Sequence, residues 1–163
     1  MLVQQIAWDV DGVYADFNQA VKLLTGFDAA LMHTDKSIRN KVWRQINAKP
    51  YEFWSSLVLI EDALKLYQLG MSRAHFFLTG LPGDSVGLGK KGKEDWLKFN
   101  FPVTDKQIHV VKRKDKALFA HKHALLVDDN EENCQMWEDA GGIVIHHKNV
   151  DDTYNELQIL LAK

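Results

Sequence analysis

Three short and fully apolar runs constrain the fold of this 163-residue chain more than any other feature of its sequence. They read Ile6-Ala7-Trp8, Phe76-Phe77-Leu78 and Leu125-Leu126-Val127. A strand with one face in water alternates apolar and polar residues, whereas a strand covered on both faces is apolar throughout. The runs therefore predict central strands of a parallel sheet.

Apolar runs and their flanking residues predict five strands in all, at residues 4–9, 73–79, 107–111, 124–128 and 142–146. Apolar residues at helical spacing predict helices between and after the strands. These helices are expected at residues 15–24, 35–46, 61–69, 94–99, 131–140 and 151–161. Because strands alternate with helices, the predicted fold is α/β, with a doubly wound, mainly parallel, five-stranded Rossmann-like sheet.

The first two predicted strands lie unusually far apart. About sixty residues separate them, whereas a parallel crossover needs only about a dozen. We interpret the extra segment, approximately residues 18–60, as a small helical cap inserted into a single domain that covers residues 1–163. The segment is rich in aromatic and basic side chains, namely Trp43, Tyr51, Phe53, Trp54, Arg39, Lys41 and Arg44.

Composition and charge exclude several classes of protein. The formal net charge of -2 provides no overall positive field, so we expect no stable complex with nucleic acid. The only cysteine, Cys134, cannot form an internal disulfide, suits a reducing compartment and is expected to be structural. No apolar run approaches the roughly 18 residues of a membrane span, and the N-terminus lacks the features of a signal peptide. We expect a soluble, cytoplasmic protein without a membrane partner.

The first predicted strand ends in two aspartates. Asp9 and Asp11 are separated by one residue, and Gly12 follows them. Ligands of open α/β sheets bind at the carboxyl ends of the strands, so both carboxylates would stand at such a site. Close carboxylates repel each other unless a cation relieves them, and Mg²⁺ is a hard cation that prefers oxygen ligands. The same residues are also typical of an ordinary turn.

Further polar groups follow at other predicted strand ends. Thr79 and Gly80 end the second strand, with a hydroxyl and a backbone N–H that can bind a phosphoryl oxygen. Asp128 and Asp129 end the fourth strand, and a basic cluster at residues 112–116 precedes it. Each group alone could be a turn, a helix N-cap or a solvated face. Their joint occurrence at strand ends favours a site that contains a metal.

In this order, the motifs resemble those of the haloacid dehalogenase (HAD) superfamily of phosphohydrolases. The residues that carry the resemblance are Asp9 and Asp11, then Thr79, then Lys116, then Asp128 and Asp129. The segment from Asp9 to Phe17 is similar to the opening of the 5'(3')-deoxyribonucleotidases and their phage and bacterial relatives. Lys114-Asp115-Lys116 and Lys93-Glu94-Asp95-Trp96 resemble further elements of that branch. The second motif departs from the Thr-Ser-Pro of the animal enzymes, because Gly80 follows Thr79 here.

The resemblance implies hydrolysis through an aspartyl-phosphate. Asp9 is the implied nucleophile, and Asp11 is the implied acid that later acts as a base. Thr79, the Gly80 N–H and Lys116 are implied to stabilise the transferring phosphoryl group.

Mg²⁺ is the cofactor that the resemblance implies. Its implied ligands are Asp9, the backbone carbonyl of Asp11, and Asp129. Asp128 is expected in the outer shell, where it would hold metal-bound waters.

The glycine-rich segment 87–93 matches nucleotide-binding motifs only in part. It contains G-x-G-x-x-G but follows the second predicted strand too late, and Glu94 stands where a P-loop requires Ser or Thr. We expect instead a mobile loop beside the site, from which Lys90, Lys91 or Lys93 reaches a phosphate.

Together these features predict a Mg²⁺-dependent phosphatase with a small phosphomonoester as its substrate. A (deoxy)nucleoside monophosphate is the expected substrate, which would make the protein a 5'-nucleotidase. Sugar phosphates and nucleic-acid 3'-phosphate ends are alternative substrates. A binding or regulatory module that has kept this fold and lost turnover is an alternative of another class, but the complete motif set argues against it. Aromatic residues of the insertion are typical of a core, and one near the cleft would also suit stacking on a base.

Overall fold

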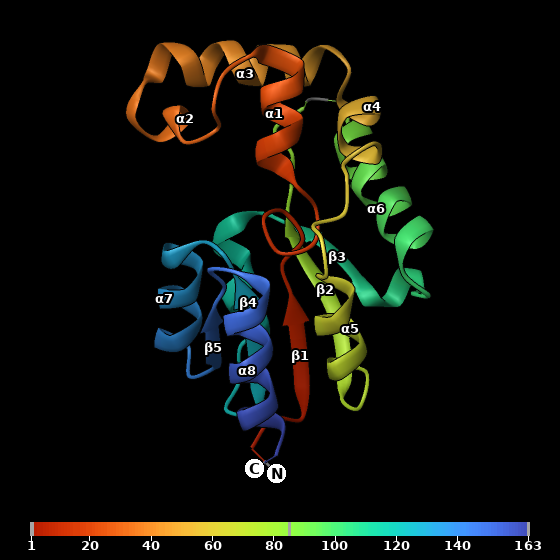
Figure 1. Cartoon of the computed structure of the whole chain (residues 1–163), viewed down its shortest axis with the longest axis vertical. Coiled ribbons are helices and arrows are strands. Elements are labelled where there is room, and N and C mark those ends of the chain that lie inside the picture. Colours follow the sequence, from red (N-terminus) through yellow and green to blue (C-terminus); the bar gives the residue numbers. More distant parts are fainter. Residues whose placement is uncertain (1, 85, 163) are drawn as a thin grey trace.

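The computed structural model describes residues 2–84 and 86–162, and its centre is one parallel sheet (Figure 1). The five strands follow the order β3-β2-β1-β4-β5, and every neighbouring pair is parallel. The strands are β1 (Gln5–Trp8), β2 (Ala74–Gly80), β3 (Ile108–Val111), β4 (Ala124–Asp128) and β5 (Ile143–His146). The predicted α/β fold is therefore confirmed, and each strand lies within one residue of its predicted bounds.

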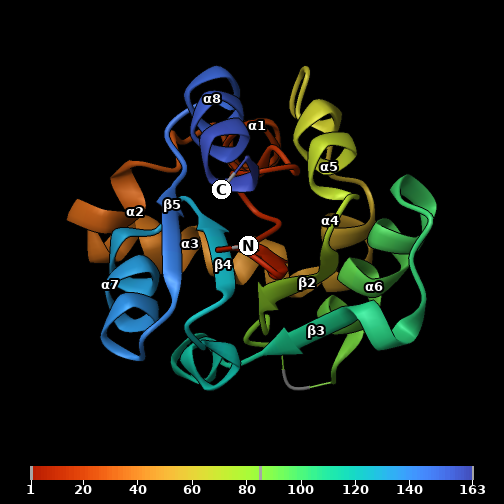
Figure 2. The same cartoon turned by 90° about the horizontal axis from the view of Figure 1, so that it is seen from below.

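Helices cover both faces of this sheet (Figure 2). One face carries α5 (Leu64–Gly70), α6 (Leu88–Asn100) and α8 (Val150–Leu161). The other face carries α7 (Glu131–Asp139) and the 3-10 helix η2 (Arg113–Phe119). A further 3-10 helix, η1 (Asp105–Gln107), leads into β3.

The central strand β1 shows why its sequence is apolar throughout. Ile6 and Trp8 belong to the core cluster on the side of α5 and α8, whereas Ala7 belongs to the cluster that also holds Trp137 of α7. All of these side chains are fully buried. A strand between two helical layers has no face that could carry a polar side chain without loss of hydration.

Four of the five helices between β1 and β2 lie beyond the carboxyl ends of the strands, at the top of Figure 1. They are α1 (Phe17–Thr25), α2 (Leu31–Thr34), α3 (Lys36–Ala48) and α4 (Pro50–Ser55). The chain leaves β1 in a turn at Gly12, whose φ of 82° is favourable only for glycine. We call residues 18–60, which contain most of these helices, the insertion.

The prediction of a mobile loop at the glycine-rich segment was wrong, because most of that segment is the beginning of α6. Two of its glycines, Gly89 and Gly92, permit close packing against α4. A Cβ on Gly89 would lie 2.9 Å from Trp54 Cδ1, and a Cβ on Gly92 would lie 2.8 Å from the carbonyl oxygen of Tyr51. Glycine weakens a helix by about 1 kcal/mol relative to alanine, but here it permits the two helices to touch.

Two other expectations concern the thiol and the membrane. Cys134 is a buried free thiol, as a structural role requires. Burial and the nearby Asp128 and Asp129 raise its pKa to about 12, which makes it a poor nucleophile. Within the described ranges, no helix combines the length and the apolar character that a membrane crossing demands.

Candidate active site

A pocket of about 960 Å³ lies between the carboxyl ends of the strands and the insertion. This volume is in the range of small-molecule sites, which is about 300–1,000 Å³. Core residues on its wall include Asp9, Asp11, Gly80, Lys93, Lys116 and Asp129. Insertion residues on its wall include Met32, His33, Arg39, Trp43, Asn47 and Trp54. The pocket therefore brings the acidic strand ends and the aromatic insertion into one site.

A buried ion-pair triad lies in the floor of the pocket. Lys116 Nζ is 2.7 Å from Asp9 Oδ1 and 2.7 Å from Asp128 Oδ2. Burial lowers the pKa of Lys116, but the two carboxylates outweigh this effect and raise it above the ordinary value. The ammonium group therefore stays charged and holds the ends of β1 and β4 together.

Both carboxylate oxygens of Asp128 already accept hydrogen bonds from neighbouring residues. Asn133 Nδ2 lies 3.1 Å from Oδ1 and 3.0 Å from Oδ2, and the backbone N–H of Asn130 donates to Oδ1 at 2.9 Å. With Lys116 on Oδ2 as well, the carboxylate is fully hydrogen-bonded. Such a group supports other residues of a site and is poorly suited to bind a metal directly.

Asp129 differs from Asp128 in its surroundings. No other residue in the described ranges donates a hydrogen bond to its carboxylate, and a Cβ on Gly12 would lie 2.0 Å from its Oδ2 atom. Limited hydration of the carboxyl group and the charges of Asp128 and Asp11 raise the pKa of Asp129 to about 6. The carboxylate is therefore free to accept a cation.

Three carboxylates converge at this point. Oxygen atoms of Asp9, Asp128 and Asp129 lie within 4.8 Å of one another. Burial raises the pKa of Asp9 to about 8, although Lys116 lowers it, and the neighbouring carboxylates add to the rise. The ammonium group of Lys116 is not sufficient to keep all three carboxylates ionised, so the donor set fits a hard cation with oxygen ligands.

Lys93 of α6 connects the ends of β1 and β2. Its Nζ donates to Asp11 Oδ2 at 2.5 Å, to the Gly80 carbonyl at 2.9 Å and to Thr79 Oγ1 at 3.0 Å. Because Thr79 Oγ1 accepts from the lysine, the hydroxyl hydrogen remains available for another acceptor. A Cβ on Gly80 would meet nothing within 4 Å, so the backbone there faces open space.

Every core residue that the sequence indicated is thus in or directly beneath the pocket. Thr79 and Asp128 do not line it, since both are fully buried, and each contacts a lysine that does. The structure brings all of these residues together at one edge of the sheet, as parallel strands require.

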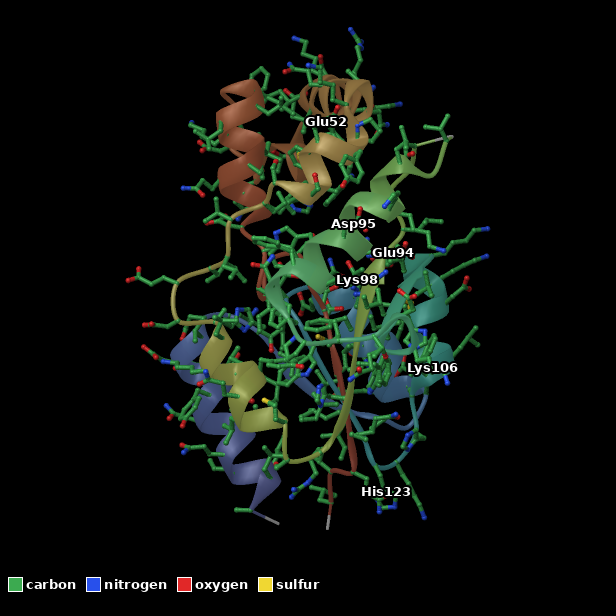
Figure 3. The ribbon with its side chains drawn as sticks, turned by 90° about the vertical axis from the view of Figure 1, so that its right-hand side faces the viewer. Glu52, Glu94, Asp95, Lys98, Lys106 and His123 are labelled. Carbon is green, nitrogen blue, oxygen red and sulfur yellow. The ribbon has the colours of Figure 1, made fainter. Side chains whose placement is uncertain are left out.

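The two other lysines of the glycine-rich segment lie away from the pocket. Lys90 Nζ is 3.7 Å from Glu94, and Lys91 Nζ is 2.6 Å from Asp95. Figure 3 labels both acidic residues on α6. Among the three lysines that were expected to reach a phosphate, Lys93 alone lines the pocket.

Sequence reasoning did not identify Asn133 or Arg113 individually. Asn133 is buried and joins Asp128 to Arg113, whose Nε donates to Asn133 Oδ1 at 3.1 Å. The available signal was an asparagine one helical turn after Asn130, the N-cap of α7. An amide at that position can reach back to the strand end, but the sequence pattern alone does not distinguish it from a surface asparagine.

Comparison with protein-family models and with curated proteins gives no match to the sequence. Solved structures do match. A HAD-like family hydrolase from Porphyromonas gingivalis is 13% identical, with a TM-score of 0.58 and 100% of both chains covered. The HAD-hydrolase YfnB from Bacillus subtilis, described as bound to magnesium, is 15% identical, with a TM-score of 0.56 and coverage of 98% of this chain and 99% of that chain.

A mutant HAD family enzyme from Bacteroides thetaiotaomicron, in complex with magnesium and inorganic phosphate, is 15% identical. Its TM-score is 0.50, and the match covers 90% of this chain and 94% of that chain. At such low identity the likeness establishes the fold and leaves the chemistry to be argued from the site. The chain has the fold of the HAD family hydrolases.

Proposed function

We propose that this chain hydrolyses phosphomonoesters with the help of Mg²⁺, through an aspartyl-phosphate on Asp9. The observation that carries the proposal is the convergence of Asp9, Asp128 and Asp129 within 4.8 Å beside one buried lysine. Two solved structures with this fold are described with magnesium, and one of them also with inorganic phosphate. That description agrees with the chemistry of the carboxylate cluster.

The metal would be held by Asp9, Asp129 and the backbone carbonyl of Asp11. Asp128 would support it from the outer shell, because its oxygens already accept hydrogen bonds from Lys116 and Asn133. Bound Mg²⁺ would offset the charge of the carboxylates and of the substrate phosphate. With that added positive charge, Asp9 would be ionised at neutral pH and able to attack.

In the first half-reaction, a carboxylate oxygen of Asp9 forms a bond to phosphorus while the bond to the ester oxygen breaks. Asp11 gives its proton to the leaving oxygen, which departs as an alcohol. Lys116 orients Asp9, and Thr79, beneath the pocket, accepts a hydrogen bond from Lys93 and supports the end of β2. The Gly80 N–H is the proposed donor to the phosphoryl group.

In the second half-reaction, water attacks the phosphorus of the aspartyl-phosphate. Asp11, now ionised, takes a proton from that water as the new P–O bond forms. The bond between phosphorus and the Asp9 oxygen breaks, and inorganic phosphate leaves. Both aspartates then have the protonation states with which the cycle began.

We propose nucleoside monophosphates as the substrates, with the insertion as a cap that selects them. The pocket continues from the carboxylates to Phe17, Trp43 and Trp54, and aromatic rings of this kind can stack on a base. Arg39 lines the same part of the pocket, and no carboxylate in the described ranges pairs with it. It could therefore donate to a base or a sugar oxygen.

A substrate panel tests the proposal. Purified protein with Mg²⁺ is offered p-nitrophenyl phosphate, nucleoside monophosphates, sugar phosphates and oligonucleotides with 3'-phosphates, and released phosphate is measured. We expect the highest kcat/KM with a nucleoside monophosphate, and loss of all activity in Asp9→Asn with retention of the circular dichroism spectrum. A preference for sugar phosphates or oligonucleotide ends would replace the nucleotidase assignment. No release from any ester would favour a binding module.

A further inference from the structure

Lys93 is a second buried lysine at the site, and it lies outside the motifs that carry the catalytic residues. Only 3% of its side chain is exposed. Its ammonium group has three hydrogens, and three acceptors surround it, on Asp11, Thr79 and Gly80. All of its donors are therefore used within the protein, and none remains for a substrate phosphate in this arrangement.

The aromatic ring of Trp54 covers the remaining side of this ammonium group. Lys93 Nζ lies 4.2 Å from the centroid of the ring, within the range of a cation–π interaction. Trp54 is itself buried, and its ring stacks on Phe17 at a centroid distance of 5.7 Å and an interplanar angle of 17°. Trp54 belongs to α4, so an element of the insertion holds a lysine of the core.

Packing between α4 and α6 makes this contact possible. Gly89 and Gly92 flank Lys93 on α6, and side chains at these positions would collide with Trp54 or with the backbone of α4. The hydroxyl of Tyr51 on α4 also donates to Asp95 of α6 at 2.9 Å. Figure 3 labels Asp95 on α6 and Glu52 on α4 and shows the two helices close together.

The two carboxylate oxygens of Asp11 have different surroundings. Oδ2 accepts from Lys93, whereas Oδ1 is buried and has no hydrogen-bond partner. Among the described side chains, it is the only carboxylate oxygen that is both buried and unpartnered. The contact with Lys93 therefore fixes the carboxyl group of a residue that lines the pocket.

We propose that Lys93 is the positioning residue for Asp11, and that Trp54 holds Lys93, so that the insertion sets the orientation of the catalytic acid. This inference rests on the proposed phosphatase function. In that function a proton passes from the Asp11 carboxyl group to the ester oxygen as its bond to phosphorus breaks, and it is replaced from the attacking water. Lys93 holds the carboxyl group in place for that transfer through Oδ2 and takes no proton itself.

The inference has a chemical consequence that a merely structural role lacks. The alkoxide that leaves an alkyl phosphate is strongly basic and needs the proton of Asp11. The p-nitrophenolate ion leaves without a proton, because its negative charge is delocalised over the ring. A misplaced Asp11 should therefore slow the first half-reaction, which kcat/KM reports, for the alkyl ester and leave it nearly unchanged for the aryl ester.

The test compares Lys93→Met with the wild type in the presence of Mg²⁺. The probes are p-nitrophenyl phosphate and the alkyl phosphate that the wild type hydrolyses fastest. We expect kcat/KM for the alkyl ester to fall by about 10²–10³-fold and kcat/KM for the aryl ester by less than about tenfold. Equal losses on the two esters, or a rise in KM alone, would overturn the inference.

Variants of Trp54 test the contribution of the insertion. Trp54→Phe keeps an aromatic face over the ammonium group and should retain activity on both esters. Trp54→Leu removes that face and should show the same selective loss on the alkyl ester as Lys93→Met. Lys91→Met is the matched control, because Lys91 is exposed on the same helix and pairs with Asp95. It should leave both activities unchanged, and a selective loss there would contradict the assignment to Lys93.

A measurement without substrate separates this inference from the proposed function. If the wild type releases no phosphate from either ester, the phosphatase proposal fails. Thermal unfolding midpoints of Trp54→Leu, Asp11→Asn and the double variant then decide whether Lys93 connects the two residues. We expect non-additive shifts with Lys93 present and additive shifts in a Lys93→Met background. Additive shifts in both backgrounds would overturn the connection. If Lys93→Met fails to fold, additive shifts of Trp54→Leu and Asp11→Asn in the wild-type background would overturn it as well.

Discussion

Lys116 Nζ lies 2.7 Å from Asp9 Oδ1, although the two residues are 107 positions apart in the sequence. The same nitrogen lies 2.7 Å from Asp128 Oδ2, and all three side chains are buried. If one of these side chains is removed, water cannot take its place beside the remaining charges, because the three side chains are buried. The lysine therefore supports both the fold and the candidate site.

Loss of Lys116 should destabilise the metal-free protein strongly. Lys116→Met leaves Asp9 and Asp128 close together without a counter-charge, and removal of one partner from a buried ion pair costs about 3–5 kcal/mol. Urea denaturation followed by circular dichroism measures this change. Lys22→Met is the control, because the Lys22–Asp28 pair, at 3.1 Å, is exposed on both sides and should contribute less than about 1 kcal/mol. Similar losses in both variants would contradict the importance of burial.

Mg²⁺ should stabilise the protein through Asp129. A ligand that binds only the folded state adds about 2.7 kcal/mol of stability at a concentration 100 times its Kd. We expect the thermal midpoint to rise with Mg²⁺, to return to its starting value with a chelator, and to respond little in Asp129→Asn. Asp139→Asn is the control, since Asp139 lies on the exposed side of α7 and pairs with Gln135. An unchanged response in Asp129→Asn would exclude this carboxylate as a ligand.

Alanine at Gly92 should destabilise the protein, although alanine is the better helix former. The substitution favours the helix by about 1 kcal/mol, but its Cβ would lie 2.8 Å from the carbonyl oxygen of Tyr51, which forces α4 and α6 apart. We expect a net loss of about 1–2 kcal/mol in urea denaturation. Phe99→Ala on the same helix serves as the control, because Phe99 is 89% exposed and should change stability by less than about 0.5 kcal/mol. A stabilised Gly92→Ala would mean that α4 and α6 do not pack this closely.

His109 should make the protein sensitive to acid. Its ring packs against Phe76 and Phe119, with centroids 5.2 Å and 5.0 Å away, and burial lowers its pKa below the ordinary value of 6.5. The unfolded chain therefore takes up a proton more readily than the folded protein. The resulting stabilisation is present above pH 6.5 and is lost as the pH falls through the lowered pKa.

The variant His109→Phe keeps an aromatic ring at this position and removes the titrating group. Urea denaturation at about pH 7.5 and about pH 5.5 should show a smaller loss of stability in the variant than in the wild type. An NMR titration of the His109 ring protons gives the pKa directly. Equal losses in both proteins, or a pKa at the ordinary value, would contradict the prediction.

Local patterns in the sequence were sufficient to predict the sheet and the composition of its carboxyl edge. Continuous apolar runs identify strands that are covered on both faces, and parallel strands end at the same edge. Asp9, Thr79 and Asp128 were therefore expected together before any contact was known. The glycines of α6 misled the same reasoning, because local propensity favours a loop there and packing against α4 requires a helix.

The sequence by itself determined the α/β fold, the residues at the strand ends and the acidic character of the site, since each follows from periodicity and residue type within a few positions. Only the tertiary structure decided that Lys116 pairs with Asp9, that Lys93 pairs with Asp11, and that Trp54 of the insertion covers Lys93. These contacts join segments that are far apart in the chain. Their partners are selected by packing and burial in the folded protein, which no local pattern records.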